Sequence, residues 1–233
     1  MEVVNMIFIF QFLLFLMGAT LASFFQLLAD RQPLGLDVVF TPSYCDSCFK
    51  QLAYYDLIPI FGYLRQHGHC RYCDHNIAPD SLIWEFIGGF SICWMASQNY
   101  LFNGHYLLVQ ILILQLAIFD AQHFYVDQLY LTQLFIIVIL LWGSSLVTNL
   151  IPAILCFVVL TLLSYLSKGL GNADVQLISL ALLAIGFTAT LWLCLLTNLF
   201  ILIHFLLRRT QTKFPFIPYF YIALLTLPLL PIK

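Results

Sequence analysis

Long stretches without a charged residue constrain the fold of this chain more than any other feature. They cover Met6–Ala29, Phe86–Phe119, Gln128–Ser167, Val175–Leu207 and Phe214–Ile232. A helix needs roughly 20 apolar residues to cross the hydrocarbon core of a bilayer. Only 9% of the residues are charged, whereas a soluble domain carries about 25%. The pattern therefore predicts an all-α polytopic membrane protein.

The three middle runs are too long for single spans, so we expect a break inside each. The candidate breaks are Ser97–His105, Gly143–Pro152 and the less marked Gly186–Thr190. They predict about eight transmembrane helices, near residues 7–28, 82–99, 106–120, 129–146, 151–166, 175–189, 191–207 and 214–231. As domains, residues 1–29 form the first transmembrane helix, residues 30–81 a cytoplasmic loop, and residues 82–233 a core of about seven helices.

Basic residues orient the predicted helices, because short loops rich in lysine and arginine stay cytoplasmic. With eight spans and the N-terminus outside, every basic residue except Lys233 falls on the cytoplasmic side. Those residues are Arg31, Lys50, Arg65, Arg71, Lys168, Arg208, Arg209 and Lys213. A single helix over Val175–Leu207 would move the last three outside, so the charge pattern favours the break near Gly186. No basic patch is evident, so we expect the lipid bilayer and no nucleic acid as a partner.

Two acids lie where apolar runs meet their loops. Asp120 ends the predicted third span and Asp174 opens the sixth, so two crossings would bring both to the cytoplasmic boundary. Two carboxyls in a partly dry site share a proton, which gives one acid and one base for attack on a peptide carbonyl. Spacing alone leaves plainer alternatives open: Asp174 caps a helix, or Asp120 merely ends a span. Asp127 is the rival to Asp120 on the same side.

A cluster of four cysteines lies in the loop after the first span. Cys45, Cys48, Cys70 and Cys73 form two C-x2-C pairs, a spacing that suits tetrahedral coordination of zinc by sulfur. The alternative is two disulfides, which a reducing cytoplasm disfavours. Three histidines lie close enough in sequence to compete as ligands: His67, His69 and His75. A closed four-thiolate site has no open position for catalysis, so this zinc would be structural.

Other polar residues in the spans have plain interpretations. Cys93, Cys156 and Cys194 are expected to pack as small apolar groups. Glu85 is either a boundary acid that snorkels or a partner of the site. Asn198 and His204 are expected to hydrogen-bond between helices.

Taken together, these residues resemble the type IV prepilin peptidases, the aspartic membrane proteases of bacteria. The resemblance runs over most of the chain, in an ordered series of motifs. They are "ATLASFFQLLADR" (Ala19–Arg31), the two cysteine pairs, "YYDLIPIFGYL" (Tyr54–Leu64), "GHCRYC" (Gly68–Cys73), "SLIWEF" with Glu85, and "KFPFIP" (Lys213–Pro218).

The resemblance implies that Asp120 and Asp174 are the catalytic pair, without assigning acid and base. Asp174 would end the family's G-x-G-D motif, with Gly171 as its first glycine and Ala173 at the usual second glycine. Alanine would be strained if that position needs a positive φ, in which case Gly171 or Asn172 would adopt it instead. Asp127 replaces a usual proline, and Gln176 replaces a usual lysine. The chain is thus expected to be a divergent member.

The compact loops look most like the competence-type peptidases of Gram-positive bacteria. The resemblance implies leader removal from pilin-like or pseudopilin precursors at the cytoplasmic face of the bacterial cell membrane. Many relatives also methylate the new N-terminus with S-adenosylmethionine. No glycine-rich strand–helix motif for a methyl donor is evident here, so methylation stays open. The alternative function is a non-enzymatic assembly or transport component with a zinc-bound loop, which gives no reason for the paired acids.

Overall fold

The structure is a computed structural model that describes residues 2–97, 104–141, 143–167, 169–207 and 214–229. Its described residues are mainly helical and contain no β-strand. Two isolated bridges, Tyr44–Gln51 and His69–Asn76, are the extended pairings among them. The chain divides into two compact units, Met1–Phe102 and Asn103–Lys233, which are described separately. The predicted all-α class is confirmed.

Unit 1 consists of two long helices and an irregular loop between them. Its elements are α1 (Glu2–Arg31), η1 (Gln32–Leu34), η2 (Tyr54–Asp56), α2 (Phe61–Arg65) and α3 (Asp80–Ser97), and α1 packs along α3. Glycines allow their backbones to touch: a Cβ on Gly88 would lie 2.7 Å from both the Ala22 Cβ and the Gly18 carbonyl oxygen. Close approach through small residues is typical of helices that pair inside membranes.

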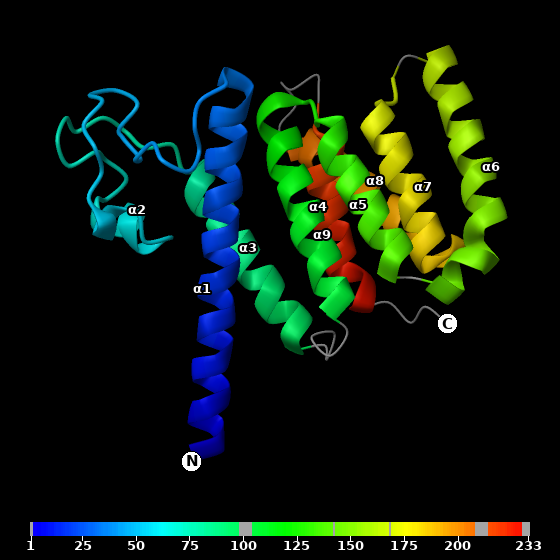
Figure 1. Cartoon of the computed structure of the whole chain (residues 1–233), viewed down its shortest axis with the longest axis horizontal. Coiled ribbons are helices and arrows are strands. Elements are labelled where there is room, and N and C mark those ends of the chain that lie inside the picture. The colour runs from blue at the N-terminus through cyan, green and yellow to red at the C-terminus, as the bar shows by residue number, and fades with distance from the viewer. Residues whose placement is uncertain (1, 98–103, 142, 168, 208–213, 230–233) are drawn as a thin grey trace. The chain divides into compact units, whose positions relative to one another are not determined.

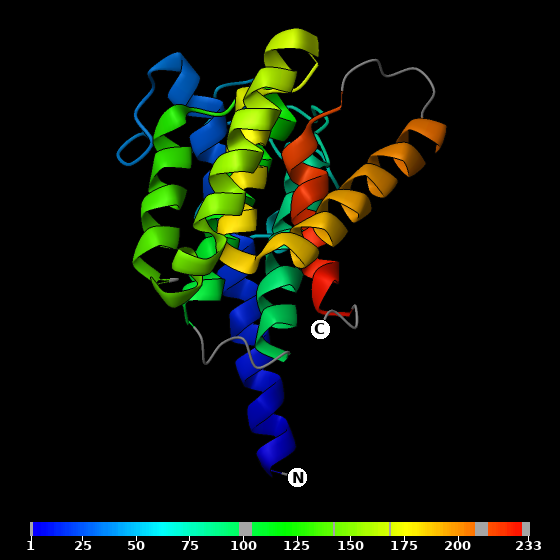
Figure 2. The ribbon, with the colours of Figure 1, turned by 90° about the vertical axis from the view of Figure 1, so that its right-hand side faces the viewer.

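Unit 2 is a bundle of helices with much of its buried core in α4 and α9. Its helices are α4 (Gly104–His123), α5 (Gln128–Leu141), α6 (Gly143–Ser167), α7 (Asn172–Ile185), α8 (Phe187–Leu207), α9 (Phe216–Thr226) and the short η4 (Leu227–Leu229). In α4, Leu116, Ala117 and Ile118 are fully buried, and in α9 Tyr221 is as well. Helix α9 packs against α4 and α8, and α6 runs beside α7 (Figure 1 and Figure 2). The exposed apolar face of α6 suits a lipid surrounding.

Each predicted span overlaps a helix of the described part, but the bounds differ: the span predicted near residues 129–146 covers α5 and also the start of α6. Four stretches are long and apolar enough to cross a membrane: Met6–Leu34, Tyr106–His123, Leu146–Ser167 and Phe187–Leu207. Three further apolar helices, α5, α7 and α9, are shorter. The chain is a multi-pass membrane protein, and the count of eight spans stays a prediction.

Of the predicted breaks between helices, one is found in the structure and another is not. Gly186, at φ 82°, separates α7 from α8, so the least marked break is confirmed. The break across Gly143–Pro152 is wrong, because α6 runs unbroken from Gly143 through Pro152. A proline removes only one helical hydrogen bond, and membrane helices tolerate it. Asn149, which suggested a turn, instead donates its Nδ2 to the Leu183 carbonyl at 3.2 Å.

Two further predictions fall on the edge of the described residues. The first break is bounded by the end of α3 at Ser97 and the start of α4 at Gly104, and residues 98–103 lie outside the described part. Several of the basic residues used for orientation also lie outside it: Lys168, Arg208, Arg209, Lys213 and Lys233.

Candidate active site and metal centre

Asp120 lies in the last turn of α4 and is nine-tenths buried. Its Oδ2 accepts a hydrogen bond of 2.9 Å from the backbone N–H of Ile217, and the N–H of Phe216 also bonds this carboxyl. Both donors belong to the first turn of α9. The first N–H groups of a helix have no partner within it and carry a partial positive charge. The backbone N–H groups at the start of α9 therefore form a binding site for the Asp120 carboxylate.

Asp174 lies in the first turn of α7, half-buried. Gly171, the residue that caps this helix, donates its backbone N–H to the Asp174 carboxyl. A Cβ on Gly171 would lie 3.1 Å from Asp174 Oδ2, so the glycine keeps room for the carboxylate. Its φ is −71°, and Asn172 and Ala173 are helical. A positive φ is therefore not needed here, and Ala173 is unstrained.

The structure brings the two acids together. The carboxyl groups of Asp120 and Asp174 are close enough to interact electrostatically, although their helices are separated by α5 and α6 in the chain. Figure 1 shows the α4–α5 and α6–α7 connections at the same end of unit 2. The sequence predicted that two membrane crossings between Asp120 and Asp174 would bring both acids to the same boundary, and the proximity of the two carboxyls agrees with that prediction. Catalysis by the pair stays a prediction.

The rival acid, Asp127, has a different position. Its Oδ1 accepts a 3.0 Å hydrogen bond from the backbone N–H of Leu129, and its carbonyl accepts one from Tyr130. It thus caps the start of α5, a typical use of aspartate. The structure gives this residue a capping role that spacing did not reveal.

A glutamine pair ties the start of α5 to α7. Gln128 and Gln176 exchange amide hydrogen bonds of 3.0 and 3.3 Å between their side chains. Both line one end of a mainly apolar pocket of about 720 Å³ between α5, α6 and α7. Gln176 therefore links the helix that carries Asp174 to the start of α5.

In unit 1 the four predicted metal ligands converge. The Sγ atoms of Cys45, Cys48, Cys70 and Cys73 all lie within 4.8 Å of one another, and the seven cysteines are free thiols. Tetrahedral zinc with bonds of about 2.3 Å separates its sulfurs by about 3.8 Å. The Cys45 and Cys73 sulfurs are 3.8 Å apart. The thiols can bind a metal ion and fit zinc, and the nearby histidines are not in the cluster.

The two cysteine pairs are built alike. In the first, Phe49 at φ 57° donates its N–H to the Cys45 carbonyl, and the Cys45 N–H bonds the Lys50 carbonyl. In the second, Asp74 at φ 56° donates to Cys70, and the Cys70 N–H bonds the His75 carbonyl. The two turns share this hydrogen-bond pattern and bring their four sulfurs together, so the loop folds as two matching halves of a candidate metal site.

Backbone donors also tune these thiols. Hydrogen bonds from the N–H groups of Tyr72 and Cys73 lower the pKa of Cys70 to about 7. For Cys73, the N–H of His75 lowers the pKa, but desolvation and the neighbouring thiols outweigh it and raise the pKa to about 11. Four neighbouring thiolates repel one another, and a bound cation would balance their negative charge. The cluster is therefore suited to a metal ion.

Buried charged residues anchor this loop. Arg31, at the end of α1, donates to the carbonyls of Asp37, Thr41 and Pro42. Glu85 is buried and accepts a 2.6 Å hydrogen bond from the Ile60 N–H as well as one from Ser23. The snorkelling interpretation of Glu85 is therefore wrong, because its carboxylate ties α3 to the loop and to α1.

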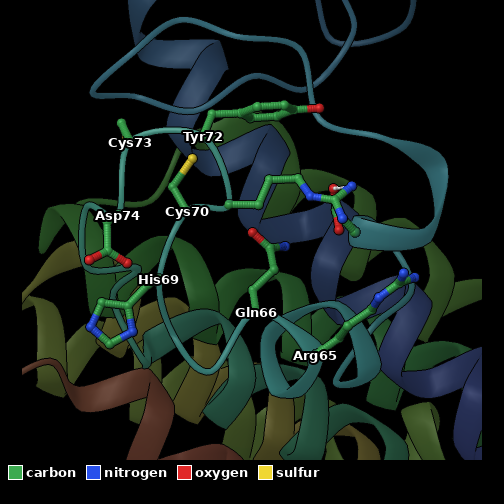
Figure 3. A pocket seen from close by; sticks show the side chains of 9 residues that line it. Arg65, Gln66, His69, Cys70, Tyr72, Cys73 and Asp74 are labelled. Atoms are coloured by element: carbon green, nitrogen blue, oxygen red, sulfur yellow. Dashed lines mark hydrogen bonds and ion pairs between the residues drawn. The ribbon is translucent and has the colours of Figure 1, made fainter.

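A polar pocket adjoins the second cysteine pair (Figure 3). Asp56, with its side chain buried, pairs with Arg71 at 3.4 Å, and Arg71 also bonds the Tyr55 hydroxyl. The pocket is lined by Asp56, Arg65, Gln66, His69, Cys70, Arg71, Tyr72, Cys73 and Asp74. The ion pair braces the loop, a role that sequence reasoning missed because the two partners lie far apart in the chain.

The remaining predictions on polar residues are mixed. His204 bonds the Tyr219 hydroxyl and so links α8 to α9, as expected. Asn198 instead donates to the Cys194 carbonyl of its own helix at 2.8 Å. Cys93 donates to the Gln11 carbonyl at 3.1 Å and contributes to the contact between α1 and α3.

Comparisons with known proteins bear on both units. The family description "Bacterial Peptidase A24 N-terminal domain" matches residues 16–99, which hold the four cysteines and Glu85 but neither aspartate. The prepilin leader peptidase/N-methyltransferase of Klebsiella pneumoniae is 35% identical over 119 residues, which is 47% of this chain and 51% of the relative. The protein of the same name from Vibrio cholerae is 22% identical over 194 residues, 76% of this chain and 75% of the relative.

A third relative of that name, from Bacillus subtilis, is 38% identical over 66 residues, 28% of this chain and 27% of its own length. The aligned part spans about half the length of the Klebsiella relative. No solved structure matches the chain. The family match lies over the cysteine loop, and the longest alignment extends across most of the chain. The chain is therefore similar to the prepilin leader peptidase/N-methyltransferases, both in the cysteine loop and, at lower identity, across most of its length.

Proposed function

We propose that this chain is an aspartic endopeptidase that removes the leader peptide from type IV pilin-like or pseudopilin precursors. The observation that carries the proposal is the convergence of Asp120 and Asp174, from separate helices, at one end of unit 2. Structural needs alone do not call for two carboxyls from separate helices to lie close enough to interact at the edge of an apolar bundle. The family relationship supports the precursor as the substrate class.

Cleavage needs only the two acids and a water molecule. One ionised carboxylate takes a proton from the water, whose oxygen attacks the scissile carbonyl carbon while the protonated partner donates to the carbonyl oxygen. The tetrahedral intermediate collapses as the C–N bond breaks. The leaving nitrogen takes the proton that the base removed from water, and the hydroxyl formed from the carbonyl oxygen returns its proton to the other carboxylate. No acyl-enzyme forms.

The proposed site lies at the cytoplasmic face of a bacterial cell membrane. The basic residues of the loops support this orientation, and the free thiols in the loop suit a reducing compartment. When bound, a zinc ion would hold the two matching cysteine turns together; it takes no part in cleavage, because four thiolates fill a tetrahedral site. Methylation of the new N-terminus by S-adenosylmethionine is a separate activity, which the mass of the cleaved product would reveal.

The decisive experiment incubates the purified protein with a pilin-type precursor and follows leader release by mass spectrometry. The wild type is expected to produce one shortened product. Asp120→Asn and Asp174→Asn should each lose at least about 99% of the rate, since general acid–base catalysis contributes 10²–10⁴-fold. The double variant should be little worse than the less active of the two single variants, because the pair acts as a unit.

Asp127→Asn is the matched control, because this acid caps a helix outside the pair. It should keep substantial activity. If Asp120→Asn cleaves normally while Asp127→Asn is inactive, the pair is wrongly assigned. Normal cleavage by all three single variants, or none by the wild type, would favour the non-enzymatic membrane component instead.

A further inference from the structure

We propose that the start of α9 keeps Asp120 ionised, so that Asp120 is the general base and Asp174 carries the shared proton. This assignment rests on the proposed peptidase function and adds the division of labour between the acids. It also gives a positioning role to the backbone of Phe216 and Ile217, far along the chain from either aspartate.

Burial disfavours a charge on Asp120, but its hydrogen bonds favour the charged form, and they are what distinguishes it from Asp174. Its carboxyl accepts two hydrogen bonds from the first turn of α9, one of them at 2.9 Å in a buried setting. Backbone N–H groups donate to a carboxylate and cannot accept from a carboxylic acid, so they favour the ion. The positive end of the eleven-residue helix α9 adds to the same effect.

The surroundings of Asp174 are less able to hold a charge. Gly171 supplies one backbone N–H, and the nearby Asp120 carboxyl repels a second negative charge. Asp174 also lies in the first turn of its helix, but with fewer donors than Asp120. When two carboxyls share one proton, it resides on the partner whose anion is less well stabilised. That partner is Asp174, which can then donate to the scissile carbonyl.

The chain contains a matched pair of helix starts for a test. Ile217 is the second residue of α9, and its N–H bonds Asp120; Leu129 is the second residue of α5, and its N–H bonds Asp127 at 3.0 Å. Proline is accepted in the first turn of a helix but has no N–H. Ile217→Pro and Leu129→Pro therefore remove equivalent donors from two different acids.

The experiment measures the pH–rate profile of precursor cleavage by the full-length protein. A base that loses a donor to its charged form needs a higher pH to ionise, so Ile217→Pro should move the acidic limb up by about one pH unit. Leu129→Pro should leave that limb in place. Ile217→Val keeps the backbone N–H, so the acidic limb of its pH–rate profile should also stay in place. This control separates the effect of losing the hydrogen bond from the effect of changing the side-chain volume.

The asparagine variants provide a second readout should Ile217→Pro fail to fold, as judged by gel filtration. Asparagine can still donate to a carbonyl but cannot take a proton from water. Residual cleavage by Asp174→Asn should thus exceed that by Asp120→Asn at least about tenfold and should lack the basic limb. An unmoved limb in a folded Ile217→Pro protein, equal shifts in both proline variants, or the opposite ranking of the asparagine variants would overturn the assignment. An inactive wild type would instead refute the peptidase function itself.

Discussion

At the scale of single residues, Asp120 and Asp127 show how similar local chemistry serves different ends. Each carboxylate accepts an N–H from the second residue of a helix. Asp127 caps the helix that follows it directly in the chain, whereas Asp120 reaches a helix nearly a hundred positions later. The first is a local contact that propensity favours, and the second exists only in the folded bundle. The long-range contact therefore marks the residue with the more demanding role.

The cysteine cluster yields a prediction at this scale. The purified protein should contain about one zinc ion, and Cys70→Ser should lose most of it and expose the loop to proteolysis, since metal binding and folding are linked. Cys93→Ser is the control, because Cys93 lies in α3 and contacts the Gln11 carbonyl. Zinc content by atomic absorption and limited proteolysis measure the two effects. Full zinc content in Cys70→Ser would reject this ligand.

The same cluster should respond to pH with a defined sign. Ligand sulfurs bind as thiolates, so protons compete with the metal. The pKa of Cys70 is about 7, hence the metal-free site gains protons as the pH falls below neutral. Zinc affinity should therefore fall with decreasing pH, by at least about tenfold per unit below pH 7, as measured with a chelator of known affinity.

The sequence predicted the clustered cysteines and the paired acids, but not what surrounds them. Spacing identifies two C-x2-C turns, because metal ligands must be brought together locally. It does not reveal that Glu85 accepts from Ile60, or that Arg31 gathers three loop carbonyls. Those partners come from separate elements, so no periodic pattern records them.

At the scale of elements, the breaks between helices illustrate what local sequence can decide. Gly186 ends α7 with a positive φ, a conformation that favours glycine. Pro152 and Asn149 looked like a second break, but α6 continues through them, and Asn149 bonds the Leu183 carbonyl in the last turn of α7. Asn149, which is a common turn residue, therefore serves here to link α6 to α7.

The contact between α1 and α3 gives a prediction at this scale. Gly88→Ala should lower the free energy of unfolding by about 1–3 kcal/mol, because the new Cβ would lie 2.7 Å from two atoms of α1 and force the helices apart. Gly143→Ala is the control, because a Cβ there meets no atom within 4 Å. Thermal unfolding in detergent compares the two. Equal melting temperatures for both variants would show that the helices are not held by this close contact.

At the scale of the whole molecule, two questions are separate: which helix ends lie on the same side of the membrane, and whether that side is the cytoplasmic one. The helices of unit 2 alternate in direction, and the starts of α7 and α9 lie at the same end as the close of α4 (Figure 1). The sequence predicted this shared end by counting crossings, without any side-chain detail. The side of the membrane follows from lysine and arginine alone, several of which lie outside the described residues.

Orientation can be tested by labelling introduced cysteines in intact cells with a thiol reagent that does not cross membranes. Phe40→Cys, in the loop of unit 1, and Tyr165→Cys, near the end of α6, should be labelled only after permeabilisation; both side chains are exposed. Gly143→Cys, at the opposite end of α6, should be labelled in intact cells. The parent protein reports any labelling of native thiols.

The three positions distinguish the arrangements that the chain can adopt. Cytoplasmic Phe40→Cys and Tyr165→Cys with external Gly143→Cys would put the cysteine loop and the paired acids on one side, as an enzyme acting on cytoplasmic leader peptides requires. Labelling of Tyr165→Cys in intact cells would place Asp120 and Asp174 outside. Opposite results for Phe40→Cys and Tyr165→Cys would separate the loop from the acids, and the number of crossings between them would then differ from the prediction by one.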